Sequence, residues 1–498
     1  MIHRIHELEG KEIPTADVCV VGTGAAGIEI ASQLARASLA VTVLEAGLDD
    51  FDFESQVLCR FESVGRAIRA PSYSEPFGLE AASTSQCRLR QYGGTTNIWS
   101  GRWKVLSPYD LSPRPRVDHS GWPIRYDELA SFYRAVADDY GLRDVLDWNE
   151  PSAAGPFEIS DAPGLSRSVH AIDDAPLNMR DKFDAELRRA PNIKVLLGAN
   201  VVEILLEEGL GAVKSLRVRS LDGREWTARA RAFVLACGTI ENARVLLQSR
   251  SQVPRGVGNA RDLVGRNLLD HPKGVLGHLC QHPSRRPPTE SRAIRVSGRK
   301  YGLGVTLAAP LLAEANLPNH CVQVKATSEA GKYLVKIYMD QLPNRDSRVS
   351  LSAERDALGA PVPRVDWRFC NEDRTAFAEF VATLSRLLAP FGSMHVEESR
   401  FTLDFLGDAS HQLGTTPMGT CAAQGVVDSD CRVFDLDNLF MAGGSVFASA
   451  GNANPTFTIL ALARRLAGHL AFRYGSKRAS QSGESAGGSE TSPSAVAS

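Results

Sequence analysis

The 498-residue sequence lacks the long apolar segments of membrane proteins. No run approaches the ~18 consecutive apolar residues that a membrane-spanning helix needs. The first residues, MIHRIHELEGKEIP, are too polar for a secretory signal peptide. We therefore expect neither export nor membrane association, and we predict a cytoplasmic protein.

The nine cysteines lack the close pairing that metal sites and haem attachment require. They are scattered, and no two of them form a Cys-x-x-Cys spacing. This pattern argues against zinc and against a covalent c-type haem, and it favours reduced thiols. We predict no metal site.

The chain also lacks an excess of charge of either sign. Its formal net charge is −2 and its isoelectric point is near 6.6. This balance gives no electrostatic footprint for nucleic acid or an acidic membrane surface, so small-molecule chemistry is the better default. The length and the 43% of hydrophobic residues suit a globular chain of two or more domain-sized units.

A dinucleotide-binding fingerprint lies near the N-terminus. A buried-strand pattern at 17–21 precedes Gly22-Thr-Gly24-Ala25-Ala26-Gly27, and a helix-like run follows. The first glycine permits a tight turn, the second lets the backbone approach a pyrophosphate, and the third lets helix and strand pack closely. A second strand, at 40–44, leads into Glu45-Ala46, where the carboxylate can accept from a ribose 2′-hydroxyl. The motif does not separate FAD from NAD, but Glu45 disfavours NADP.

The stretch 411–470 combines a histidine, a strand and a helix start. It opens with His411, continues through an apolar strand from 438 to Gly443-Gly444, and reaches Gly451-Asn-Ala-Asn454-Pro455-Thr456 before an Ala/Leu-rich helix. Proline suits a first helical turn and excludes the preceding residue from the α region, so we expect Asn454 at a helix mouth. The positive end of that helix would favour a reduced flavin ring. Asn454 could instead serve as the helix N-cap.

The middle of the chain interleaves two kinds of segment. Residues 88–103 pack glycines, hydroxyls and tryptophans densely enough to lie against a flat ring. Strand patterns at 193–205 and 232–237, with a helix at 241–247, return the chain to the sheet begun at 17. A helix at about 127–140, β alternation within 276–405 and a helix near 371–389 suggest a separate domain.

These motifs resemble those of the glucose-methanol-choline (GMC) oxidoreductase family over about residues 16–470. The resemblance is closest to the sugar dehydrogenases and pyranose oxidases, which pair a histidine with an asparagine. Besides the segments above, it is carried by Val234-Leu-Ala-Cys-Gly238-Thr-Ile-Glu241, Val264-Gly-Arg-Asn-Leu-Leu-Asp-His271-Pro, Leu342-Pro-Asn-Arg-Asp-Ser-Arg-Val349 and His411-Gln-Leu-Gly-Thr415.

The expected fold is α/β (α+β overall), with a Rossmann-like FAD-binding domain interleaved with a sheet-plus-helix substrate domain. We assign 1–110, 190–275 and 410–474 to the FAD-binding domain and 111–189 and 276–409 to the substrate-binding domain. The Ser/Gly/Ala-rich residues 475–498 are expected to form a disordered tail.

The resemblance implies FAD as cofactor and oxidation of an alcohol to a carbonyl. His411 takes the position of the catalytic base, Asn454 that of its hydrogen-bonding partner, and His271 is expected to support packing or the flavin. Ile98 stands where some pyranose oxidases carry a flavin-linked histidine, so the FAD is expected to be non-covalent. Cofactor contacts are expected from Gly22, Gly24, Ala25, Ala26, Gly27, Glu45, Ala46, Gly93, Gly94, Thr96, Asn97, Trp99, Ser100, Val201, Ala236, Cys237, Gly238, Gly443, Gly444, Asn454, Pro455 and Thr456.

Alcohol oxidation needs a proton acceptor for O–H and a hydride acceptor for C–H, tasks that suit a neutral imidazole and flavin N5. We expect the substrate to be a sugar, a cyclitol or a glycosylated natural product such as an aminoglycoside, whose amine Asp404 and Asp408 could receive. Two alternatives stay open: a redox-neutral lyase of the hydroxynitrile-lyase type on the same flavin scaffold, and an NAD-dependent dehydrogenase. Whether oxygen or another molecule reoxidises the flavin, and whether the chain self-associates, cannot be inferred from the sequence.

Overall fold

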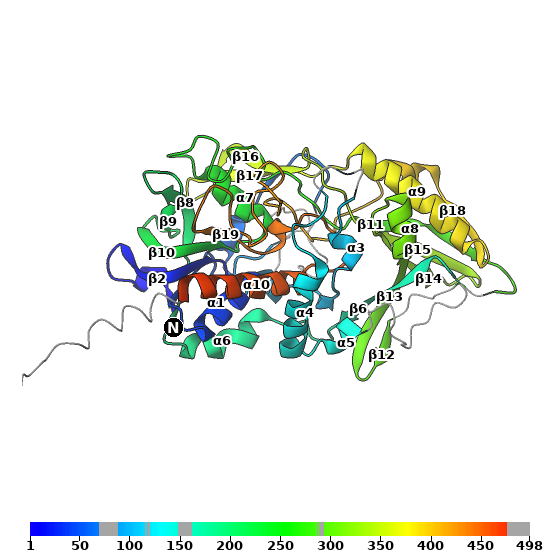
Figure 1. The fold of residues 1–498 in the computed structure, drawn as a ribbon, viewed down its shortest axis with the longest axis horizontal. Coiled ribbons are helices and arrows are strands. Elements are labelled where there is room, and N and C mark those ends of the chain that lie inside the picture. Colours follow the sequence, from blue (N-terminus) through cyan, green and yellow to red (C-terminus); the bar gives the residue numbers. More distant parts are fainter. Residues whose placement is uncertain are drawn as a thin grey trace, which may run out of the picture.

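The computed structural model describes residues 1–68, 88–114, 117, 120–147, 162–285, 287 and 293–475. Apart from Gly475, which ends a helix, the predicted disordered tail lies outside the described residues. Two large sheets occupy opposite halves of the molecule (Figure 1). The predicted α/β class is confirmed.

The first sheet has eight strands and is built around the N-terminal fingerprint. At its centre, β2 pairs in parallel with both β3 and β10. All of β3 and the last four residues of β2 are buried, the continuous apolar pattern of a parallel sheet that is covered on both faces. The order is β1 (Ile2–Arg4), β7 (Ile193–Leu197), β3 (Val41–Glu45), β2 (Glu12–Val21), β10 (Glu225–Leu235), β9 (Val213–Arg219) and β8 (Asn200–Leu206), with β19 (Leu439–Met441) beside β10.

Two helices from opposite ends of the sequence pack together on this sheet. Directly after the glycine loop, α1 (Ala25–Arg36) packs against α10 (Thr456–Gly475) (Figure 1). A Cβ at Gly27 would lie 1.9 Å from the carbonyl oxygen of Gly22, so only glycine lets α1 approach the loop this closely. Also in this half are α6 (Met179–Arg189), which packs on α1, and α7 (Thr239–Gln248).

The second sheet also has eight strands, and its pairings are antiparallel. Along β14, Val322 and Val324 are fully buried while Lys325, on the opposite face, is half-buried. Helix α9 (Asn371–Leu388) lies along this sheet (Figure 1). One face therefore belongs to the core and the other is polar. The order is β18 (Gly392–Val396), β11 (Lys273–Gln281), β15 (Lys332–Tyr338), β14 (Cys321–Ala326), β13 (Arg299–Leu307), β6 (Leu165–Ile172) and β5 (Arg102–Trp103), with β12 (Ile294–Val296) beside β13.

A small third sheet and nine further helices complete the described structure. The third sheet joins β16 (Arg348–Arg355), β17 (Pro361–Asp366) and β4 (Glu62–Ser63). The remaining helices are η1 (Ile5–Glu7), α2 (Phe53–Val57), η4 (Gly94–Asn97), α3 (Pro108–Leu111), α4 (Tyr126–Tyr140), α5 (Arg143–Asp147), α8 (Ala309–Ala315), η5 (Glu398–Thr402) and η6 (Gly444–Val446).

Each of the cysteines within the described residues is a free thiol. No helix in the described part of the chain combines the length and the apolar character needed to cross a bilayer. The domain boundaries stay a prediction.

Candidate functional site

A cavity of about 300 Å³ extends from the glycine loop after β2 to the start of α10. It brings together residues that lie more than 400 positions apart, such as Gly22 and Asn454. Of the predicted site residues, its wall contains Gly22, Gly24, Ala25, Ala26, Glu45, Ala46, Gly94, Thr96, Trp99, Ser100, Val201, Ala236, Cys237, Gly238, His411, Gly443, Gly444, Asn454, Pro455 and Thr456.

Three predicted cofactor residues lie behind the cavity wall and brace it. Gly27 forms the close contact between α1 and the glycine loop. The N–H of Gly93 donates to the hydroxyl of Thr23 at 3.1 Å. The side-chain amide of Asn97 donates to the carbonyl of Tyr92 at 3.0 Å. The two hydrogen bonds and the close contact of Gly27 hold the glycine loop and the loop around Gly93 in shape. Direct contact of the three residues with the flavin stays a prediction.

The glycine-loop end of the cavity fits an adenine dinucleotide. Helix α1 begins after Gly24 and has no acidic residue in its first turn, so its free N–H groups and positive end are available to a pyrophosphate. A Cβ at Gly24 or Gly443 would meet nothing within 4 Å, so the backbone there is open to a ligand. The free N–H groups and the open backbone at this end therefore suit the pyrophosphate of FAD.

Glu45 connects the end of β3 to the glycine loop. One carboxylate oxygen accepts from the backbone N–H of Thr23 at 2.9 Å and from the Thr23 hydroxyl, and the other accepts from the N–H of Gly47 at 2.8 Å. Each carboxylate oxygen can accept two hydrogen bonds. The side chain is thus held in place with acceptor capacity left for a ribose hydroxyl.

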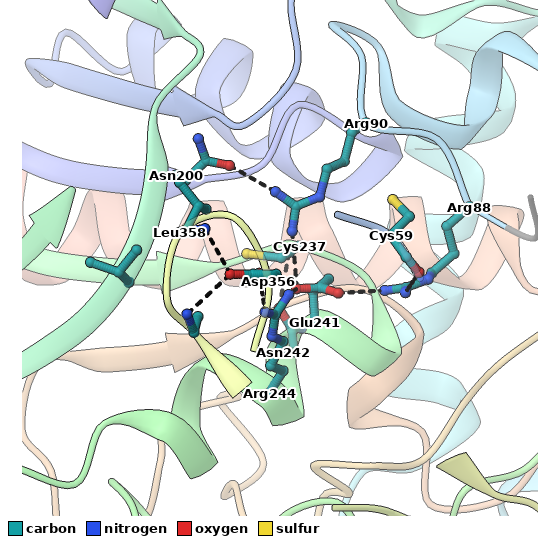
Figure 2. Close-up of polar contacts among 12 residues, drawn as sticks. Cys59, Arg88, Arg90, Asn200, Cys237, Glu241, Asn242, Arg244, Asp356 and Leu358 are labelled. Carbon is teal, nitrogen blue, oxygen red and sulfur yellow. Dashed lines mark hydrogen bonds and ion pairs between the residues drawn. The ribbon is translucent and has the colours of Figure 1, made fainter. Parts of the chain in front are cut away.

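A buried network of charges lines the same cavity (Figure 2). Glu241, in the first turn of α7, accepts from Arg88 at 2.7 Å and from Arg90 at 3.2 Å. Arg244 lies between Glu241, at 3.4 Å, and Asp356. Burial opposes ionisation of Glu241, but Arg244, Arg88 and Arg90 hold its pKa at about 2. The guanidinium groups of Arg88, Arg90 and Arg244 thus hold the buried carboxylates of Glu241 and Asp356 in place beside the cavity.

The rings of His411 and His271 form a pair at the other end of the cavity. Their Nδ1 atoms lie 3.0 Å apart, and the ring planes meet at 82°. His271 Nε2 lies 3.1 Å from the carbonyl oxygen of Ala450. A carbonyl only accepts, so His271 Nε2 carries a hydrogen and a neutral His271 offers a lone pair at Nδ1. His411 Nδ1 must then be the donor, which leaves the lone pair of His411 on Nε2.

The surroundings of both rings favour this neutral pair. Burial lowers the pKa of His271. Burial also lowers the pKa of His411 well below its usual 6.5, a proton on His271 would lower it further, and the charges of Lys273 and Arg102 act in the same direction. At neutral pH both imidazoles are therefore uncharged, and His411 can accept a proton.

Asp270 fixes the two histidine segments relative to each other. Its Oδ1 accepts from the backbone N–H groups of His271, at 2.6 Å, and Ala409, at 2.8 Å, and its Oδ2 accepts from that of His411 at 3.1 Å. Burial, and then the neighbouring carboxylate of Asp408, raise the pKa of Asp270. The sequence motif contained Asp270, but only the fold reveals its role.

Asn454 lies on the cavity wall just before α10. Within the described residues no hydrogen bond joins its side chain to another group, so the alternative of a helix cap is not realised. Its neighbour Asn452, by contrast, is engaged with Lys104. The amide of Asn454 is therefore available to a ligand in the cavity.

The two carboxylates considered for an amine are used elsewhere. Asp404 is exposed and forms an ion pair with Arg66 at 3.2 Å. Asp408 accepts from the backbone N–H of Ser410 at 3.0 Å. Neither belongs to the described cavity wall. Ile98 is buried directly after η4 and likewise lies outside that wall.

The chain is similar to known oxidoreductases. Two family models, both described as GMC oxidoreductase, match residues 179–273 and 343–463. The chain is similar to 6'''-hydroxyparomomycin C oxidase of Streptomyces lividus, with 28% identity over 93% of this chain and 94% of the relative. It is also similar to paromamine 6'-oxidase of Streptomyces fradiae, with 26% identity over 92% of each chain, and to the fructose dehydrogenase large subunit of Gluconobacter japonicus, with 24% identity over 92% of this chain and 98% of the relative.

Solved structures share the fold. Pyridoxine 4-oxidase from Mesorbium loti superposes with a TM-score of 0.57 at 18% identity, covering 91% of this chain and 98% of the other. Formate oxidase gives a TM-score of 0.60 at 14% identity, covering 94% of this chain and all of the other.

Proposed function

Because the chain belongs to the GMC oxidoreductase family, we propose that it oxidises a hydroxyl group of a sugar, cyclitol or glycosylated natural product to a carbonyl, with His411 as the base. It is an FAD-dependent alcohol oxidoreductase.

The observation that carries the proposal is the lone pair on His411 Nε2, in the same cavity as the glycine loop. An alcohol gives up an O–H proton to a base and a C–H hydride to an acceptor, and both must lie within about 3–3.5 Å of the reacting atoms. Bound FAD supplies the hydride acceptor, flavin N5. His411 Nε2 takes the proton while its Nδ1–H stays bonded to His271.

Asn454 and α10 assist the same step. The free amide of Asn454 donates a hydrogen bond to the substrate oxygen and orients it toward His411. The N-terminus of α10 carries a partial positive charge that favours negative charge in the cavity. Asp270 keeps the backbone of His411 in place. The chain thus provides a base, an orienting donor and a rigid frame.

The cofactor-holding roles follow the cavity wall. The backbone of 22–26 and the start of α1 hold the pyrophosphate, Glu45 accepts from the ribose, and the backbone of Val201 meets the adenine. We infer non-covalent binding because Ile98, at the position of the flavin-linked histidine, has no nucleophilic atom. The substrate class is supported by relatives named for paromomycin-type compounds and for fructose.

The test uses the purified holoprotein. We expect a yellow protein that releases FAD on denaturation, and whose absorbance near 450 nm is bleached under argon by at least one member of a panel of sugars, cyclitols and glycosides. A colourless protein that reduces NAD would support the nicotinamide alternative. A yellow protein that stays oxidised with every alcohol but cleaves a hydroxynitrile would support the lyase.

A further inference from the structure

The polar face of the second sheet carries basic side chains next to the cavity. Lys336 on β15 lies directly opposite Gln323 on β14. Lys325 is two residues further along β14, so its side chain is on the same face. The register through β6 and β13 places Arg102 on this face as well. We call the three side chains of Arg102, Lys325 and Lys336 the basic face.

The basic face is continuous with the reaction site. Arg102 lines the cavity together with His411. Its guanidinium donates to His170 Nε2 at 2.7 Å. Burial, and then the charges of Lys336 and Arg102, lower the pKa of Lys325, as expected of like charges held close together. The basic face therefore reaches the cavity through Arg102.

Within the described residues, no carboxylate neutralises the basic face. None of its three members forms an ion pair there, whereas Lys332, at the start of the same strand β15, pairs with Glu329 at 2.9 Å. His170 adds no positive charge of its own, because burial and then the charge of Arg102 lower its pKa to about 3 and keep the ring neutral. Clustered like charges are unfavourable, and an anion that binds there relieves the repulsion.

An unsatisfied amide lies among these cations. Gln323 is only 7% exposed, and its side-chain oxygen has no hydrogen-bond partner among the described residues. A buried acceptor without a partner is costly unless a ligand supplies a donor. A hydroxyl group is such a donor. The face therefore offers positive charge for an anion and an acceptor for a hydroxyl.

We propose that Arg102, Lys325 and Lys336 bind a carboxylate or phosphate ester on a polyhydroxylated substrate, and that Gln323 binds another of its hydroxyls. This inference rests on the proposed function, because it places the anionic group of the substrate beside the cavity in which His411 receives the proton. It narrows the substrate to sugar acids or sugar phosphates.

The same arrangement disfavours an aminoglycoside. An ammonium group at this position would face three cations. Asp404 and Asp408 are engaged with Arg66 and with the backbone of Ser410. The relatives named for paromomycin-type compounds are 26% and 28% identical to this chain. We infer that this chain differs from them in the charge of its substrate.

A matched series of sugars tests the inference on the holoenzyme. Glucose, glucuronate, glucose 6-phosphate and glucosamine differ mainly in charge, and their binding is measured by calorimetry or by perturbation of the flavin spectrum. We expect glucuronate or glucose 6-phosphate to bind at least roughly tenfold more tightly than glucose, glucosamine to bind most weakly, and the preference to shrink with added salt. Which anion binds more tightly separates carboxylate from phosphate.

Single substitutions test whether the basic face causes the preference for anionic sugars. Lys325→Gln and Arg102→Gln are expected to reduce the preference for the anionic sugar to about that for glucose. Lys332→Gln removes a lysine from the same strand that is already paired with Glu329, so it should leave the preference intact. Retention of the full preference in Lys325→Gln and in Arg102→Gln would assign the selectivity to another site.

The outcomes separate this inference from the proposed function. Three outcomes would overturn the anion site, whether or not an alcohol bleaches the flavin: all four sugars bind equally, both anionic sugars bind more weakly than glucose, or glucosamine binds most tightly. Tight binding of glucuronate or glucose 6-phosphate that is lost in Lys325→Gln supports the anion site. If no alcohol then bleaches the flavin, the proposed oxidation is overturned and the binding site stands.

Discussion

Replacement of His271 by phenylalanine isolates the contribution of the histidine pair. Phenylalanine keeps a buried ring next to His411 but offers no lone pair to His411 Nδ1, 3.0 Å away in the native structure. When His411 becomes protonated in the reaction, its Nδ1–H bond to His271 is charge-assisted. Such a bond contributes about 1.5–3 kcal/mol. At 1.36 kcal/mol per factor of ten, its loss should slow flavin reduction roughly ten- to hundredfold.

The assay is stopped-flow bleaching of the flavin under argon with an alcohol identified in the substrate panel. His271→Phe should retain bound FAD, show a lower maximal rate, and shift the acid limb of the rate to lower pH, because protonated His411 is less stable without its acceptor. His320→Phe is the matched control. His320 is fully buried, accepts from the N–H of Asp340 at 3.1 Å and lies outside the cavity wall, so its replacement should cost stability without slowing bleaching.

Two results would refute this reasoning. The first is a folded, yellow His271→Phe protein that bleaches at the wild-type rate. The second is an equal loss of rate in His320→Phe, which would attribute the effect to general loosening of the core.

Four further predictions concern single substitutions. Asn454→Ala should retain FAD but slow bleaching roughly ten- to hundredfold; an unchanged rate would remove the amide from the reaction. Gly24→Val should fold, because Gly24 has φ of −68° and a Cβ there meets no atom within 4 Å. The variant should purify colourless, because the side chain blocks the approach of FAD to the glycine loop, and full flavin occupancy would contradict this role of the loop. Arg102→Gln should raise the pKa of His411, since Arg102 is among the groups that lower it, and should move the acid limb of the pH dependence of bleaching to higher pH. An unchanged acid limb would show that the charge of Arg102 does not act on His411. The pKa of Asp270 is raised in the folded state, so the stability that this shift contributes is present below the unfolded-state pKa of about 3.9 and is lost as pH rises through the folded-state pKa. Asp270→Asn removes the titrating group, so the melting temperature of the variant relative to that of the wild type should increase with pH. A difference in melting temperature that does not change with pH would contradict the shift.

The parts of the site that the sequence predicted are those written in local patterns. Gly22, Gly24 and Glu45 belong to a strand-loop-helix unit whose geometry follows from neighbouring residues, and all three line the cavity. Asn454 was placed at a helix mouth by the following proline, and α10 begins at Thr456. Such features need only the steric limits of proline and glycine and the positions of helix ends.

The parts that the sequence did not predict depend on contacts between distant segments. Arg244 lies three residues after Glu241 on α7, a contact that helical spacing predicts. Arg88 and Arg90 also reach Glu241, and no local pattern indicates that their segment meets α7. The contact between the rings of His271 and His411 joins residues 140 positions apart, and no local pattern predicts it; support of packing or of the flavin by His271 stays a prediction. The basic face is likewise a product of strand register, because its members come from β5, β14 and β15.

The central claim is tested most directly by anaerobic bleaching of His411→Ala. General-base catalysis contributes about 10²–10⁴-fold, so the variant should purify yellow, with the wild-type flavin spectrum, and bleach at least about a hundredfold more slowly with the same alcohol. Bleaching of His411→Ala at the wild-type rate would contradict the assignment of His411 as the proton acceptor.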